Sequence, residues 1–472
     1  MEKKSSKTIK WINLQQEAIE FKPSRSLGNQ YRIVPDLFFI GEKESYYMFY
    51  TPLLLRIYMI PKDFVISTQP IELRKEYFPQ LIESMLMLPN DQALALIPRV
   101  NLNGTSNHIR LILSSRCNSN CSYCYAGAKS IGKSINLDHL ETLINYLPEN
   151  LHIDIELHGN GEPTIAMQEL KKAYKLCKKR FKFVKFSTQT NGLFSKKTAD
   201  WLIKNQISTS FSIDGPEFIH NKQRPAKNSK TNGFNKTMET LRYFQEHNLG
   251  TSVICVVTAY SNKYLNEIYQ FFKSINIKTI KLNPVVDVGN ARLFDDDIHN
   301  PPDISEFAQN FALIQSQAYL DKIMIDSDFM GSFHTRKPHP MHCQACMPQF
   351  VLDTDGKILA CSEAASIETP DKNPFYWAEI KDNQVIVNEE KKNELMNSHM
   401  FNMDGCSNCF LKWICAGSCL HQNYSENHSL RQPIKSHCEA KRAYTMTYFS
   451  KLAEYLLNGL PPIASDSSLN SV

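Results

Sequence analysis

Hydrophobic residues recur along this chain in two spacing patterns. Between residues 108 and 283, short continuous apolar runs alternate with segments in which apolar residues return every three or four positions. Continuous apolar runs of this length predict buried strands, whereas the wider spacing predicts amphipathic helices. The predicted strands are 108–113, 152–157, 183–188, 208–213, 251–258 and 278–283. Strands that alternate with helices indicate a parallel sheet covered by helices.

Six strand–helix units in succession predict an α/β fold, specifically a partial (β/α)6 TIM-like barrel. In such barrels the active site gathers at the carboxyl ends of the strands. Polar, turn-forming segments follow the first four predicted strands, at Arg116–Tyr125, His158–Thr164, Ser187–Gly192 and Ser212–Pro216. We therefore expect the chemistry of this protein to lie among these segments.

The chain before residue 106 has a different pattern. Aromatic and β-branched residues predict strands within Tyr31–Ile40, Tyr46–Tyr50 and Leu53–Ile60, and apolar residues at helical spacing predict a helix over Leu73–Leu88. These elements make a small α+β domain. An exposed edge of its sheet could take up an extended peptide as an added strand. A stabilising extension without a partner is the alternative.

The remaining segments complete the predicted domain organisation. A helix is expected over Ile304–Leu320 and another over Glu439–Leu457, whereas the polar tail from Pro461 is expected to be disordered. The predicted units are an N-terminal α+β domain at 1–105, a central α/β core at 106–325, a cysteine-rich domain at 326–458 and a tail at 459–472.

Composition and charge restrict the class of protein. The 472 residues are 42% hydrophobic and 21% charged, and the net charge is only +5. These values are ordinary for a globular protein and do not indicate a nucleic-acid partner. No apolar run approaches the length needed to cross a bilayer, and no secretory segment follows the basic start. We expect a cytoplasmic protein without membrane or nucleic-acid partners.

Thirteen cysteines are unusual for a cytoplasmic protein, where thiols stay reduced and serve metals or catalysis. Three lie at 117–124 and eight between 343 and 438. Cys177 and Cys255 stand apart on apolar patterns and are expected to be core residues. The clustering of the other eleven predicts metal centres.

The first cluster has the spacing C-x3-C-x2-C at Cys117, Cys121 and Cys124. Iron–sulfur cubes are normally held by four cysteine thiolates. Three thiolates on one loop could hold a cube and leave its fourth iron open, as catalytic metal sites keep one position open. A zinc knuckle or three incidental thiols are the alternatives.

This motif, with Tyr123 before its third cysteine, resembles that of the radical S-adenosylmethionine (SAM) superfamily. The resemblance implies that the open iron chelates the amino and carboxylate groups of SAM. It also implies reductive cleavage of SAM to a 5′-deoxyadenosyl radical, which abstracts a hydrogen atom from a substrate.

The same resemblance implies SAM contacts on the later segments. Gly161 and Glu162 match the part of the family's G-G-E-P segment that receives the SAM amino group, although Asn160 replaces its first glycine. Ser212 matches a ribose contact and Arg224 a carboxylate contact, for which a guanidinium is well shaped. Tyr123 belongs to the same implied site. Ordinary turns and helix caps are the alternative for each segment.

The second cysteine cluster resembles the SPASM extension of radical SAM enzymes. Val351–Lys357 is predicted to form a hairpin within it. The resemblance implies two auxiliary [4Fe-4S] clusters, one held by Cys343, Cys346, Cys361 and Cys419 and the other by Cys406, Cys409, Cys415 and Cys438. Cys343 is the position at which the family varies. Two zinc sites with four thiolates each would use the same count.

Together the two motifs predict a radical SAM maturase that installs a cross-link or an oxidised residue in a ribosomally made peptide. Its partners would be a short precursor peptide and an electron donor such as flavodoxin or ferredoxin. The general base is not identified. An anaerobic sulfatase maturase, which forms formylglycine, is the alternative enzyme; Ser362 and Glu363 follow Cys361 where that family has an aspartate. A zinc-stabilised binding scaffold is the alternative of another class.

Overall fold

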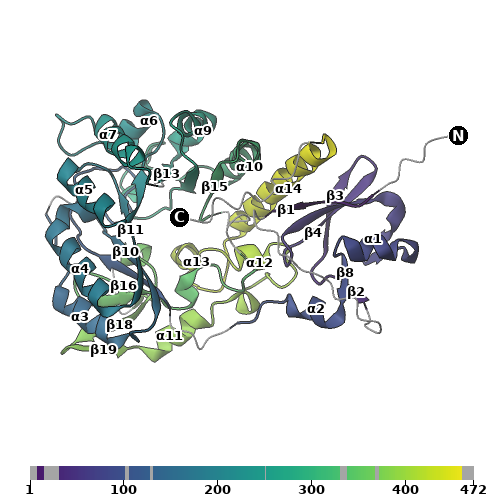
Figure 1. The fold of residues 1–472 in the computed structure, drawn as a ribbon, viewed down its shortest axis with the longest axis horizontal. Coiled ribbons are helices and arrows are strands. Elements are labelled where there is room, and N and C mark those ends of the chain that lie inside the picture. The colour runs from purple at the N-terminus through teal and green to yellow at the C-terminus, as the bar shows by residue number, and fades with distance from the viewer. Residues whose placement is uncertain are drawn as a thin grey trace.

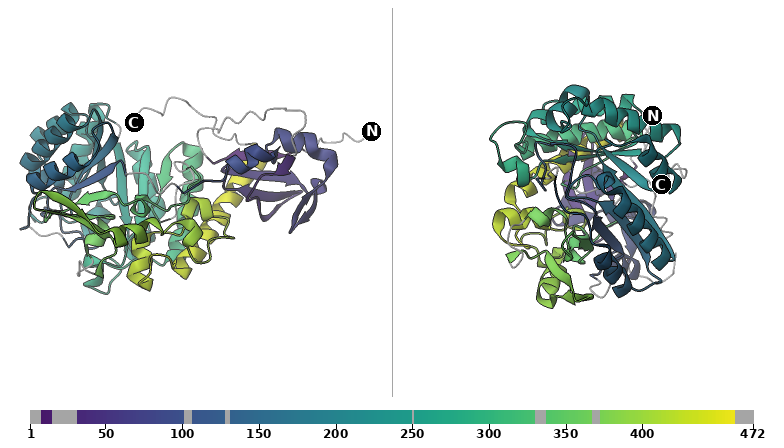
Figure 2. Two further views of the ribbon diagram at one scale, coloured as in Figure 1. Left: turned by 90° about the horizontal axis from the view of Figure 1, so that it is seen from below. Right: turned by 90° about the vertical axis from the view of Figure 1, so that its left-hand side faces the viewer.

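The computed structural model describes residues 8–14, 31–100, 106–127, 131–249, 251–329, 337–366 and 372–459. Figure 1 shows an elongated molecule in which the N-terminal sheet lies at one end and a larger sheet with its helices at the other. The views in Figure 2 place the long C-terminal helix between them. The predicted tail beyond residue 459 lies outside the described residues.

The N-terminal part is built on a four-stranded antiparallel sheet in the order β1-β5-β4-β3. Its strands are β1 (Lys10–Asn13), β3 (Phe38–Lys43), β4 (Tyr46–Thr51) and β5 (Arg56–Pro61). Two strand pairs and two short helices adjoin it: β2 (Tyr31–Ile33) with β8 (Met87–Pro89), β6 (Val65–Thr68) with β7 (Ile71–Leu73), α1 (Phe78–Glu83) and α2 (Asn90–Ala95). The small α+β character expected here is therefore observed.

The helix predicted over Leu73–Leu88 is wrong in its extent. Only Phe78–Glu83 is α-helical, and Met87 and Leu88 belong to strand β8. Met85 takes a positive φ of 64°, a conformation that ends a helix. Met87 and Leu88 are both buried. Consecutive apolar residues show neither the alternation of a half-buried strand nor the spacing of an amphipathic helix, so the sequence could not distinguish the two.

The two faces of the N-terminal sheet pack against different partners. Phe49 and Tyr58 face a local core with α1, whereas Tyr50 and Ile57 join the main core of the protein. The ring of Tyr50 lies 4.8 Å from that of Phe449 on the C-terminal helix. Burial of large aromatic side chains on both faces ties this sheet to the rest of the chain.

The larger sheet contains the six predicted strands in chain order, all parallel. They are β9 (His108–Ile112), β10 (His152–His158), β11 (Phe183–Thr190), β12 (Ser208–Ser212), β13 (Thr251–Val257) and β14 (Thr279–Pro284), followed by β15 (Met324–Asp326). The intervening helices are α3 (Leu137–Tyr146), α4 (Met167–Arg180), α5 (Lys196–Lys204), α6 (Glu217–Gln223), α7 (Gly233–Glu246), α8 (Ala259–Asn262), α9 (Leu265–Ser274) and α10 (Ile304–Asp321). The predicted α/β class is confirmed.

The cysteine-rich part continues the same sheet. Strand β16 (Phe350–Leu352) pairs in parallel with β9, and β17 (Lys357–Leu359) follows it as the predicted hairpin. Then come β18 (Tyr376–Lys381) and β19 (Gln384–Val387), and the helices α11 (Glu389–Met396), α12 (Lys412–Cys415), α13 (Leu420–Asn427) and α14 (Lys435–Leu457). Among the described residues the sheet runs from β15 to β19 without closing, so the partial barrel remains a prediction.

The two faces of the parallel sheet differ in burial. Along β10, Ile153, Ile155 and Leu157 are buried, as expected for the face that helices cover. The other face, which we name the polar face, carries residues that are direct cross-strand neighbours and are mostly half-buried or exposed. Its polar residues are His108, Arg110, Asp154, Glu156, His158, Lys185, Ser187, Gln189, Ser208, Ser210, Ser212, Ser252 and Lys281, and the apolar Ile254 lies between the last of the β12 serines and Lys281. The sheet thus offers a polar surface instead of a second core.

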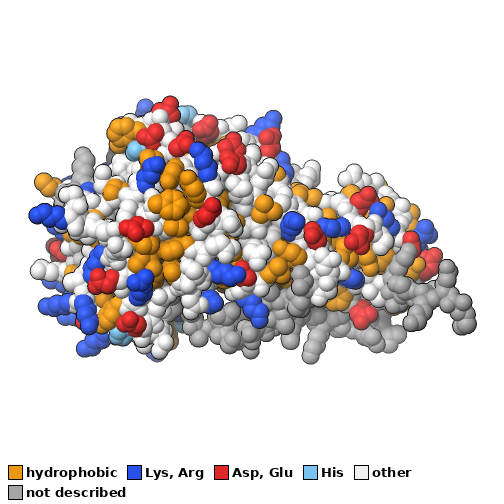
Figure 3. All heavy atoms as spheres, turned by 90° about the horizontal axis from the view of Figure 1, so that it is seen from above, with side chains coloured by type: hydrophobic (Ala, Val, Ile, Leu, Met, Phe, Trp, Pro, Cys, Tyr) orange, Lys and Arg blue, Asp and Glu red, His pale blue; other side chains and the backbone are white. Residues whose placement is uncertain are grey.

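The exterior carries no large region of one charge on the side shown in Figure 3, where basic and acidic side chains are interspersed with apolar ones. No helix among the described residues combines the length and the apolar character needed to cross a membrane.

Candidate active site

The first cysteine loop, Arg116–Tyr125, follows the carboxyl end of β9, where the sequence predicted it. Two backbone hydrogen bonds join it to the carboxyl end of α6 and the residues that follow: Ser122 N–H donates to Gln223 O at 2.9 Å, and Asn120 N–H donates to Pro225 O at 2.8 Å. The loop is therefore anchored across the sheet, near the ends of both β9 and β12.

The structure brings the three thiols of this loop together. Burial raises the pKa of Cys121 to about 12; the negative charges of Cys124 and Cys117 contribute, and the positive charge of Arg224 opposes them. All three cysteines are partly exposed. The three thiols therefore lie close enough for the charge of one to affect the pKa of another.

The segment after β10 packs directly against this loop. A side chain at Gly161 would place its Cβ 2.0 Å from the carbonyl oxygen of Arg116, so only glycine fits there. The Glu162 N–H donates to the same oxygen at 2.8 Å. The Glu162 carboxylate is buried and accepts hydrogen bonds from Thr164 and Thr190 and, at 2.8 Å, from the Asn191 N–H. It therefore joins the segments after β10 and β11.

Tyr123, Asp214 and Arg224 form a buried group beside the thiols. The Tyr123 hydroxyl donates to Asp214 at 2.6 Å and accepts a hydrogen bond from Arg224 Nη1. Arg224 Nη1 also lies 3.8 Å from Asp214, whose side chain is fully buried. Arg224 Nε is buried with no hydrogen-bond partner in the described structure, so it is a free donor. Ser212 is half-buried at the end of β12 on the polar face.

Three residues that sequence patterns did not assign also position the loop. Asn191 Nδ2 donates to Ser119 at 3.0 Å and lies 3.9 Å from the Cys117 sulfur. Asn290 donates from its side chain to Cys121 O and from its backbone to Cys124 O, both at 3.0 Å. Asp214 orients Arg224, as described above. Asn191 and Asp214 lie in polar segments that follow predicted strands, and this position was the only sequence feature that could have indicated their role. No sequence feature indicated a role for Asn290.

The first auxiliary set of thiols gathers around Cys419. Burial raises the pKa of Cys419 to about 12, and the charges of Glu363 and Cys343 add to this effect. Cys419 in turn contributes to the raised pKa values of Cys346 and Cys361. The four cysteines that the resemblance grouped, including Cys343, thus lie in one neighbourhood.

The second set borders a single cavity. Cys406, Cys409, Cys415 and Cys438 line a space of about 210 Å³ between α12 and the start of α14. Burial raises the pKa of Cys406 to about 12, and its three partners in the set contribute. These four thiols are the ones that the resemblance grouped as the second auxiliary site.

A buried ionic network connects the polar face to the first auxiliary set. Arg110 donates to Glu156 from Nε at 2.7 Å and to Ser362 from Nη1 at 2.5 Å. Burial raises the pKa of Glu156, but Arg110 and His158 outweigh it and bring the value to about 2. Burial lowers the pKa of His158 to about 4. Because Ser362 follows Cys361, this network places the auxiliary thiols beside the polar face.

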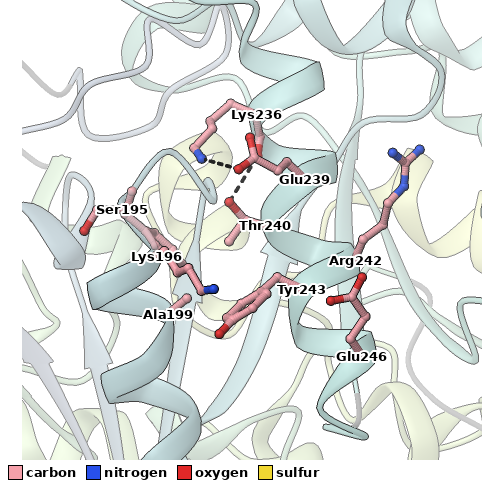
Figure 4. A pocket seen from close by; sticks show the side chains of 10 residues that line it. Ser195, Lys196, Ala199, Lys236, Glu239, Thr240, Arg242, Tyr243 and Glu246 are labelled. Atoms are coloured by element: carbon pink, nitrogen blue, oxygen red, sulfur yellow. Dashed lines mark hydrogen bonds and ion pairs between the residues drawn. The ribbon is translucent and has the colours of Figure 1, made fainter.

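Two surface hollows lie outside these networks. One of about 580 Å³ borders the cysteine loop at Cys121 and includes Lys222 and the exposed Phe294. The other, of about 280 Å³, lies between α5 and α7, with Lys236 and Glu239 paired at 3.0 Å (Figure 4). No cysteine lines the second hollow, so it has no part in the thiol chemistry.

The donor groups fit the cofactors that the motifs imply. Eleven thiols in three neighbourhoods are ligands that iron–sulfur cubes use. Among the described residues, no three Cys, His, Asp or Glu side chains are grouped so that they could hold one metal ion. A single zinc ion needs ligands about 2.3 Å from one point, whereas each thiolate of a cube bonds its own iron atom. The free Arg224 Nε suits a carboxylate, such as that of SAM.

Sequence comparison identifies relatives of the whole arrangement. Residues 111–272 match the family model of the radical SAM superfamily. A cysteine-type anaerobic sulfatase-maturating enzyme of Clostridium novyi is 23% identical over 72% of this chain and 94% of its own length. The radical SAM cyclopropyl synthase TigE of Paramaledivibacter caminithermalis is 21% identical over 69% of this chain and 70% of its own length.

Solved structures share the fold. That of anSMEcpe with bound AdoMet and Cp18Cys peptide superposes with a TM-score of 0.60 at 21% identity, covering 74% of this chain and 98% of the other. Streptococcus suis SuiB bound to its precursor peptide SuiA gives a TM-score of 0.53 at 14% identity, covering 77% and 88%. The motif, the fold and the matched family model lead to one conclusion: this chain belongs to the radical SAM superfamily and is an enzyme of that family, which uses a [4Fe-4S] cluster and SAM.

Proposed function

We propose that this protein is a peptide maturase that installs a cross-link or an oxidised residue in a ribosomally made peptide. The observation that most strongly supports this proposal is the position of the polar face, which lies between two thiol sites. Arg116–Tyr125 stands at the end of β9 on one side, and Arg110 reaches Ser362 beside Cys361 on the other. A polar strip across parallel strands suits a peptide backbone with its many hydrogen-bonding groups.

The implied cofactors, a [4Fe-4S] cluster and SAM, would supply radical chemistry that removes a hydrogen atom from the substrate. Cys117, Cys121 and Cys124 would hold that cluster. Arg224 is oriented by Tyr123 and Asp214 to receive the SAM carboxylate, and Gly161 brings its loop against the cysteine loop. Glu162 uses its carboxylate mainly to hold neighbouring segments, so its backbone is the better candidate for SAM contact.

Two auxiliary clusters would be held by the sets around Cys419 and around the cavity at Cys406. They would accept the surplus electron when the substrate is oxidised, and a flavodoxin or ferredoxin would supply electrons to the first cluster. The protein itself contributes position and electrostatics.

The N-terminal unit, residues 1–105, would bind the leader part of the peptide. Among the described residues β3 pairs only with β4, which leaves its outer edge open to an added strand. Lys43, the last residue of β3, pairs with Glu454 of α14 at 3.3 Å, which ties this end of the strand to the helix. The other proposed units are the radical SAM core at 106–325 and the SPASM unit at 326–458.

Formation of formylglycine in a sulfatase is the second candidate function. The similarity to the Clostridium novyi sulfatase-maturating enzyme, which extends over nearly all of that protein, favours it. Ser362, in place of an acid directly after Cys361, is engaged by Arg110 and offers no base there. Glu363, the next residue along the chain, is a carboxylate close enough to raise the pKa of the Cys361 thiol.

One experiment separates the two functions. The reconstituted enzyme is incubated anaerobically with SAM, reductant and either a candidate precursor peptide or a sulfatase-derived peptide containing cysteine or serine. Mass spectrometry of each peptide identifies the product. A mass loss in the candidate precursor peptide supports the maturase, and modification of only the sulfatase peptide supports formylglycine formation.

A further inference from the structure

A buried lysine stands beside the second auxiliary cavity. Lys441, on α14, has only 1% of its surface exposed. Its ammonium group donates to Ser418 Oγ at 2.5 Å, lies 3.8 Å from the sulfur of Cys415 and lies 4.6 Å from the ring of Phe329. A neutral hydroxyl and an aromatic ring are thus among its neighbours, and its charge also affects the pKa values of His437 and Cys438.

No carboxylate of the described residues forms an ion pair with Lys441. Burying an ammonium ion without a counter-charge costs several kcal/mol even after relaxation. The site therefore needs a negative group, and the only candidates in contact are the thiols of the cavity. A ring quadrupole and one hydroxyl do not replace a full negative charge.

The other charged residues around the cavity are placed differently. Lys412 pairs with Asp36 at 2.7 Å, and Lys435 lies 4.0 Å from Glu439 with 92% of its side chain exposed. Asp404 and Arg442 are exposed; the Arg442 side chain hydrogen-bonds Cys409, but solvent screens its charge. Lys441 alone combines burial with contact to a thiol of the set. Its charge acts in a medium that screens it little.

We propose that Lys441 is the fixed counter-charge of an anionic metal–thiolate cluster in this cavity and raises the reduction potential of that cluster. The proposal rests on the proposed function, because it assumes that the four thiols hold an iron–sulfur cube. Such a cube is negatively charged and becomes more so when it accepts one electron from the oxidised substrate. A nearby cation stabilises the reduced form more than the oxidised form.

The test uses the full-length protein in a Cys121→Ala background, so that only the auxiliary sites titrate. Lys441→Met removes the charge with similar volume, Lys441→Arg keeps it, and Lys435→Met is the matched control from the same cavity wall. Iron content is measured first. A redox titration followed by electron paramagnetic resonance then gives the midpoint potential of each auxiliary cluster.

We expect Lys441→Met to weaken electron binding at one cluster about tenfold, a shift of about 59 mV to lower potential. Lys441→Arg and Lys435→Met should leave both potentials near those of the parent. If Lys441→Met loses about four irons and Lys441→Arg retains them, the charge requirement is equally supported. Unchanged potentials with full iron in Lys441→Met, or equal iron loss in both Lys441 variants, would overturn the proposal.

The same measurements distinguish failure of the proposed function. Zinc in place of iron at the second site of the parent protein would refute the auxiliary cluster there. The role of Lys441 as a counter-charge would then be tested by metal content alone. Loss of metal from Lys441→Met with retention in Lys441→Arg would support this role. Equal metal retention in both variants would contradict it.

Discussion

Arg110 donates a hydrogen bond of 2.5 Å to Ser362, although 252 positions separate the two residues in the chain. Arg110 lies on the first parallel strand, and Ser362 directly follows an auxiliary cysteine. The same guanidinium holds Glu156 on the next strand. This one side chain therefore fixes the distance between the polar face and the first auxiliary site.

Replacing Arg110 with Met should destabilise the protein strongly. Glu156 would remain as a buried charge without its main partner, and breaking a buried pair in this way costs about 3–5 kcal/mol. The double variant Arg110→Met/Glu156→Leu should recover most of this loss, because no charge remains buried. Thermal unfolding of both apo-proteins measures the difference. Similar melting temperatures for the single and double variants would show that the pair is not the cause.

Acid should destabilise the fold in two steps. His158 is neutral in both states above about pH 6.5; below this the unfolded chain takes up a proton, whereas the folded chain does not until about pH 4. Folding stability therefore falls between these values, by on the order of 3 kcal/mol. The ionic form of Glu156 adds stability above its unfolded pKa of about 4.3. That contribution is lost as the pH falls towards about 2.

Urea unfolding of the apo-protein between pH 7 and pH 4.5 tests the first step. The variant His158→Gln should show a flatter dependence on pH, and His152→Gln, at an exposed position on the same strand, should keep the parent profile. An unchanged slope in His158→Gln would remove that histidine from the explanation.

Arg224→Lys should weaken SAM binding about 10- to 100-fold without loss of iron. A lysine keeps the positive charge near Asp214 but lacks the planar fork that fits a carboxylate, and a hydrogen bond between charged groups contributes about 1.5–3 kcal/mol. Equilibrium binding of SAM to the reconstituted protein measures the effect. Arg242→Lys, in the hollow between α5 and α7, is the control and should bind normally.

Iron counting should separate the three proposed clusters. The parent protein should hold about twelve irons per chain, and Cys438→Ala should hold about eight, because one cube loses a ligand. Cys177→Ala should keep the parent count, since Cys177 is buried in the core on α4 away from the clusters. Loss of iron from Cys177→Ala, or full iron in Cys438→Ala, would contradict the assignment.

Sequence patterns predicted the elements that depend on the spacing of nearby residues. The six parallel strands carry closely spaced apolar residues, such as Ile153, Ile155 and Leu157 on β10, and the ends of these strands carry the motif residues in order. Both the strands and the site segments could therefore be predicted from the sequence. The helix over Leu73–Leu88 failed because buried strand residues such as Met87 and Leu88 show no alternation. The extra strands β15 and β16 are three residues each, too short to show a pattern.

Contacts between distant segments could not be predicted in this way. The pairing of Arg110 with Ser362 depends on β16 joining the edge of the sheet at β9, which no local pattern encodes. Lys441 reads as an ordinary helix residue, and only the packing of α14 against the cavity reveals that it is buried. The grouping of the auxiliary cysteines came from family resemblance, and the structure places each set in one neighbourhood.

The most direct test of the central claim is release of 5′-deoxyadenosine. The anaerobically reconstituted protein is incubated with SAM and a strong reductant, and the nucleoside is quantified by chromatography. The account predicts release by the parent protein and none by Cys121→Ala, which should still hold its auxiliary iron. Release by Cys121→Ala at the parent rate, or none by an iron-loaded parent, would contradict it.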